Sequence, residues 1–149
     1  SKNHARWKAV MSYKIPLGIL AGFGCWWAAF FLIGYSAVFI NPALLEAVRP
    51  AIADNDWSLI TTSMFIGAIV MYFFINPLAG WITVFITRNK IHAAITALPL
   101  TLYAISAHWF RLWGILPGWY NIMVVLLIPP LVYLGGYFVK ESTKTETNQ

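Results

Sequence analysis

Four apolar runs that carry no Asp, Glu, Lys or Arg dominate this chain and limit what it can fold into. At 1.5 Å per residue of α-helix, each run is long enough to cross a hydrocarbon core of about 30 Å. Inside lipid every backbone N–H and C=O group needs a partner within the protein, so runs of this length are expected to be helices. The runs cover about residues 16–40, 58–87, 92–110 and 120–139. We therefore predict a single all-α transmembrane domain over residues 1–149 with four spans and a polar tail at residues 140–149.

The overall composition excludes most classes of soluble protein. Hydrophobic residues make up 60% of the chain and charged residues 10%, whereas about a quarter of the residues in soluble domains are charged. The net charge of +5 sits in short segments beside the apolar runs, a pattern that sets membrane orientation rather than one that lines a nucleic-acid groove. We expect a lipid bilayer as the surroundings of this chain and no nucleic acid as a partner.

The distribution of lysine and arginine predicts that both termini face the cytoplasm. Cytoplasmic connections of membrane proteins carry an excess of these residues. If the N-terminus, the 88–90 connection and the tail are inside, eight of the ten basic residues fall there: Lys2, Arg6, Lys8, Lys14, Arg88, Lys90, Lys140 and Lys144. Arg49 and Arg111 fall outside. This distribution predicts an N-in, C-in protein of the inner or plasma membrane.

The longest connection, residues 41–57, is expected to contain a short amphipathic helix that lies in the membrane interface between the first and second spans. Asn41 can cap this helix and Pro42 can occupy its first position. Residues 54–56 resemble the start of a calcium loop but lack the glycine and glutamate that must follow, so we predict no metal site there. Asp56 is instead expected to cap the second span.

Two backbone features within the spans suggest packing or a polar path. Gly18 and Gly22 form a GxxxG pattern, which lets helix backbones approach closely, either within the chain or with a partner. Asn76 and Pro77 interrupt the second run, because proline removes a backbone hydrogen bond. The interruption predicts a simple kink, or alternatively a discontinuous helix whose freed carbonyl groups and Asn76 amide line a substrate path.

The histidines raise the possibility of a cofactor. Sixteen residues separate His92 from His108, about 24 Å along a helix, so these two cannot ligate one haem iron. His108, with Trp109 and Trp113 beside it, could border a haem, a pigment or a quinone shared with a partner subunit, or could be an ordinary interfacial histidine. The cofactor itself is unknown from the sequence.

The function is constrained mainly by what the spans lack. No sequence motif for a nucleophile, paired carboxylates or a nucleotide loop is present, so catalysis by this chain alone has little support. We expect a noncatalytic integral membrane subunit that scaffolds or stabilises a larger membrane complex, either energy-transducing or transporting, together with other membrane subunits. The alternatives are a homo-oligomeric small transporter or channel with a polar path at the proline-broken helices, and a cofactor- or quinone-binding membrane anchor.

Overall fold

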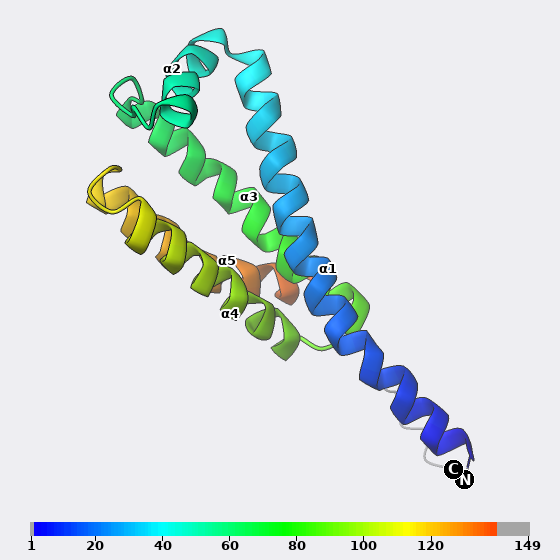
Figure 1. Cartoon of the computed structure of the whole chain (residues 1–149). Helices are drawn as coiled ribbons and strands as arrows, with labels where there is room; N and C mark the ends of the chain where they lie inside the picture. The colour runs from blue at the N-terminus through cyan, green and yellow to red at the C-terminus, as the bar shows by residue number, and fades with distance from the viewer. Residues whose placement is uncertain (1, 140–149) are drawn as a thin grey trace.

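The computed structural model describes the backbone of residues 2–139 and the side chains of residues 13–139 (Figure 1). Within this part the chain is helical and contains no strand. Its elements are α1 (Lys2–Ile40), α2 (Pro42–Ala53), α3 (Thr62–Thr87), α4 (Ile91–Ile105), the π-helix η1 (Ser106–Arg111) and α5 (Gly118–Tyr137). The predicted polar tail with Lys140 and Lys144, and the side chains of Lys2, Arg6 and Lys8, lie outside the described residues.

Four of the helical segments are long and apolar enough to cross a membrane, which confirms the predicted multi-pass, all-α architecture. They are Tyr13–Ile40, Thr62–Thr87, Ile91–Arg111 and Gly118–Tyr137. The second span begins at Thr62 rather than at residue 58, because Ile60 N–H bonds to the Trp57 carbonyl in a turn before it. α3 then continues as one helix through Asn76 and Pro77.

α3 occupies the centre of the bundle and packs against α1, α4 and α5 (Figure 1). Glycines lie at close contacts of α3 with both α1 and α5. A Cβ atom on Gly22 of α1 would lie 2.7 Å from the Ala79 carbonyl oxygen, and a Cβ atom on Gly80 of α3 would overlap the Val132 carbonyl oxygen of α5. Gly18 lies one turn before Gly22 on the same face of α1, against Thr87. The helix axes therefore approach as closely as they do because these positions have no side chain.

One end of the bundle gathers the 88–90 connection with the ends of two other spans. The Lys90 ammonium lies 4.4 Å from the centre of the Tyr137 ring at the end of α5. The methyl group of Thr87 lies against Gly18 near the start of the first span. These contacts match the alternation expected of four spans; which compartment this end faces stays a prediction.

α2 and the turn after it connect the other ends of α1 and α3. The Asn41 side chain accepts a hydrogen bond from Leu44 N–H, and Pro42 occupies the first turn of α2. The position of α2 at a membrane surface stays a prediction. The expected capping of α3 by Asp56 is wrong: its carboxylate accepts from Ser58 N–H at 3.0 Å, well before the helix, and these bonds to Ser58 lower the pKa of the Asp56 carboxyl.

Candidate functional site

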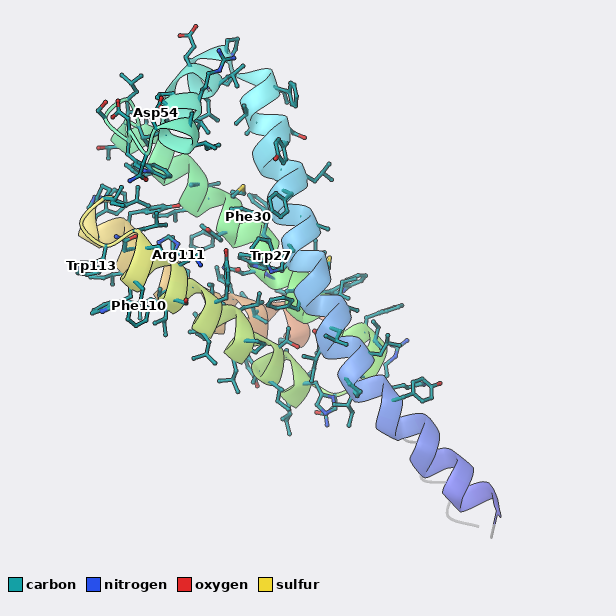
Figure 2. All side chains as sticks on the ribbon, viewed as in Figure 1. Trp27, Phe30, Asp54, Phe110, Arg111 and Trp113 are labelled. Atoms are coloured by element: carbon teal, nitrogen blue, oxygen red, sulfur yellow. The ribbon has the colours of Figure 1, made fainter. Side chains whose placement is uncertain are left out.

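The third span ends in a π-helix, and this local change of winding places His108. Leu112 N–H bonds to the Ala107 carbonyl at 3.1 Å, five residues back, instead of to the residue four back. A π turn accommodates one more residue than an α turn and is frequently found at functional sites. His108 is buried at this turn, whereas Trp109 and Phe110 beside it are exposed. Figure 2 shows Phe110 pointing away from the bundle and Trp113 at its outer end.

Asn121, on the first turn of α5, is the partner of His108. Its Oδ1 lies 2.8 Å from His108 Nδ1, and both side chains are buried. Its Nδ2 donates to the carbonyl oxygens of Leu112 and Leu116 at 3.5 and 3.3 Å. The amide therefore connects α5, the 112–117 turn and η1. The sequence analysis did not single out Asn121. It could have been noticed as the one side-chain amide in the apolar run 120–139.

A pocket of about 310 Å³ lies beside this pair. His108, Trp109, Trp113 and Asn121 line it together with aliphatic side chains of α4 and α5, including Ile122 and Leu126. The structure thus brings the three sequence-predicted residues His108, Trp109 and Trp113 to one pocket. The rings of Trp109 and Trp113 form a pair with centroids 4.5 Å apart and planes inclined by 33°.

The pocket opens to the exposed surface of the bundle. Trp109, Ile122 and Leu126, which line it, expose 57%, 46% and 62% of their surfaces. Its volume lies at the lower end of the range for small-molecule sites, about 300–1,000 Å³. The exposed, mainly apolar lining suits an apolar occupant, and a group the size of a single substituted ring fits this space better than a large planar cofactor.

Asn76, the other predicted site residue, lies in the packed interior instead. It is fully buried, and its Oδ1 accepts a hydrogen bond of 2.7 Å from Trp26 Nε1 of α1. Its Nδ2 is buried without a hydrogen-bond partner. The backbone of Pro77 is packed against Gly135 of α5, so this part of α3 is covered by a second helix. Sequence reasoning did not single out Trp26, because a tryptophan within an apolar run has no local mark of a buried hydrogen bond.

The proline positions in the other spans do not meet Asn76. Pro99 of α4 and Pro129 and Pro130 of α5 lie on the surface of the chain, and none of them lines the pocket near His108. Within one chain the breaks therefore do not surround a common cavity.

Other polar groups in the spans bond within the bundle. The hydroxyl groups of Thr83 and Thr96 lie 3.0 Å apart across α3 and α4, and each also lies within hydrogen-bond distance of a carbonyl group of its own helix. Such bonds satisfy a hydroxyl group inside lipid. Among the described residues, no three His, Cys, Asp or Glu side chains gather where they could hold a metal ion.

Comparison with known proteins yields no match to a family model, to a curated protein or to a solved structure. The functional proposals therefore depend on the chain's own residues.

Proposed function

We propose that this chain is a noncatalytic integral membrane subunit that stabilises a larger membrane complex, energy-transducing or transporting. The observation that carries the proposal is a row of aromatic side chains on the outer half of α1: Trp27, Phe31, Tyr35 and Phe39. We call this row the α1 ridge. A transmembrane helix of another subunit is the partner whose chemistry fits it.

The α1 ridge follows the i, i+4 spacing that forms the protruding rows of a helix surface. The Trp27 and Phe31 rings are stacked at 5.4 Å, and the Phe31 and Tyr35 rings at 6.2 Å. Phe31, Tyr35 and Phe39 are increasingly exposed, at 49%, 62% and 80%. Rows of this kind pack into the grooves of a facing helix.

α1 also contains the least buried of the four spans. Only 17% of its most apolar window is buried, compared with 33% to 39% in the other three spans. Figure 1 shows α1 and α3 diverging toward α2, so α3 does not cover the outer half of α1. Exposure to lipid alone does not indicate a partner, since lipid tails are as apolar as these side chains. The feature that favours a partner is that the aromatic rings form one row along α1. We expect this row to extend from the middle of the membrane to its surface, whereas aromatic residues that only anchor a helix lie at the membrane surface.

Purification from native membranes in mild detergent tests the proposal. We expect a second membrane protein to co-purify in a fixed ratio, and to be lost when Phe31→Ala and Tyr35→Ala are combined. The matched control combines Leu98→Ala and Leu102→Ala, which remove equally exposed side chains from α4 and should leave the partner bound. A monodisperse monomer without a co-purifying protein would contradict the proposal. A pure oligomer of this chain would favour the homo-oligomeric transporter instead.

A further inference from the structure

The hydrogen bonds around Asn121 determine which nitrogen of neutral His108 carries the proton. Asn121 Nδ2 faces the carbonyl oxygens of Leu112 and Leu116, both acceptors. The reversed amide would place Oδ1 against those two oxygens, so the network assigns Oδ1 to the side of His108. An amide oxygen can only accept, and His108 Nδ1 must therefore donate its proton to it across 2.8 Å. In the neutral ring, Nε2 is then left with a lone pair and no hydrogen.

This lone pair is the free polar function that His108 and Asn121 offer to the pocket. Both polar atoms of the Asn121 side chain are engaged, and the aliphatic residues that line the pocket have no polar side-chain atoms. The indole N–H groups of Trp109 and Trp113 can only donate, so Nε2 is the free side-chain acceptor of the lining. His108 Nε2 can accept a hydrogen bond but cannot donate one. A ligand that meets it with a hydroxyl group gains a bond, whereas a ligand that meets it with a carbonyl oxygen places two acceptors against each other.

The walls of the pocket add a second requirement. Trp109 and Trp113 form a paired aromatic wall at the outer end of the bundle, and flat rings stack well on such surfaces. Because the remaining wall is aliphatic and the pocket opens to lipid, the ligand must itself be apolar apart from its hydroxyl group.

We propose that the pocket formed by His108, Asn121 and the Trp109–Trp113 pair binds a membrane-dissolved aromatic ring that carries a hydroxyl group, and that it prefers a quinol to the corresponding quinone. His108 is the binding residue. Asn121 is a positioning residue that keeps the proton on Nδ1. This inference is independent of the subunit role proposed above.

Binding of duroquinol and duroquinone to the full-length chain in nanodiscs, with any subunit that co-purifies, tests the inference directly. Isothermal titration under argon gives both affinities. We expect duroquinol to bind at least about tenfold more tightly, since a hydrogen bond is exchanged for an acceptor–acceptor contact. His108→Phe keeps a ring but removes the nitrogen, and should lower the affinity for duroquinol to that for duroquinone.

Asn121→Leu separates the positioning role of Asn121 from the binding role of His108. It leaves the imidazole in place but removes the acceptor for Nδ1–H, so Nε2 can also carry the proton and donate to a carbonyl oxygen. The quinol-to-quinone affinity ratio should fall toward one, while duroquinone binding is kept or improved. His92→Phe, the same substitution as His108→Phe at the other histidine of the third span, is the matched control and should leave the ratio unchanged.

Three outcomes would overturn the inference. Equal binding of duroquinol and duroquinone by the wild-type chain would refute the proton assignment. Binding of neither, or displacement of both by a plain alkyl amphiphile, would show that the pocket is a lipid-filled groove. A visible absorption band in the purified protein that is lost in His108→Phe would identify the occupant as a metal-containing pigment. None of these outcomes affects the test of the α1 ridge, which measures a co-purifying protein.

Discussion

The contact between Gly135 of α5 and Pro77 of α3 allows the effect of Gly135→Ala on the free energy of unfolding to be predicted. A Cβ atom on Gly135 would lie 2.5 Å from both the Cα and the carbonyl carbon of Pro77, whereas carbon atoms pack favourably at about 3.5–4.0 Å. The carbonyl oxygen of Pro77 is nearer still, so α3 and α5 would have to separate by more than about 1 Å, because backbone atoms on both sides cannot rotate away. Overpacking of this kind costs about 1–3 kcal/mol, and a rigid obstacle puts this contact near the upper value.

Gly135→Ala should therefore lower the free energy of unfolding by about 2 kcal/mol, after about 1 kcal/mol of helix propensity gained from alanine is subtracted. Gly67→Ala in α3 is the matched control: a Cβ atom there meets nothing within 4 Å, so stability should be unchanged or rise by up to about 1 kcal/mol. Unfolding by SDS in mixed micelles, followed by tryptophan fluorescence, measures both. Equal effects of the two substitutions would refute close backbone packing at Gly135.

Two further predictions concern the buried hydrogen bond and the orientation. Trp26→Phe keeps an aromatic ring but removes the donor to Asn76, and should lower the free energy of unfolding by about 0.6–1.7 kcal/mol in the same SDS assay; unchanged stability would show that the bond contributes nothing net. In a Cys25→Ala background, Gly114→Cys should react with an impermeant thiol reagent from outside intact cells, whereas Asn89→Cys should react only after permeabilisation. Labelling of Asn89→Cys from outside would overturn the predicted orientation.

The four spans could be predicted because the physics of the bilayer acts on the sequence locally. An apolar run without charges has to satisfy its backbone inside lipid, and a helix does so with its own residues. The observed helices differ from the predicted spans where side-chain hydrogen bonds and turns determine the local structure. The second span starts four residues late because Asp56 and Trp57 organise a turn, and the last part of the third span winds as a π-helix that hydropathy does not reveal.

The candidate site could be predicted only in part, because it depends on pairing between distant residues. His108, Trp109 and Trp113 stand out as an imidazole and indoles near the end of an apolar run. Asn121 becomes meaningful only when α5 packs against η1, which then determines the protonated nitrogen of His108. Asn76 shows the opposite case: its sequence context predicted a simple kink or, as the alternative, a polar path, and tertiary packing places its side chain against Trp26 in the interior.

The two proposed binding surfaces, the α1 ridge and the pocket beside His108, lie at the same end of the bundle, away from the closely packed glycines. Around Gly22, Gly80 and Gly135 the helices are in close contact, so this part of the bundle leaves no space for a ligand between them. Toward the end that carries α2, α1 diverges from α3 (Figure 1), and η1 places His108 beside α5 and an open pocket. The rigid part therefore fixes the helix positions, while the outer part exposes surfaces with specific chemistry. Substitutions of the exposed ridge residues Phe31 and Tyr35 should accordingly alter binding with little effect on the SDS unfolding midpoint, in contrast to Gly135→Ala. A loss of stability as large as that from Gly135→Ala would assign the α1 ridge a structural role instead.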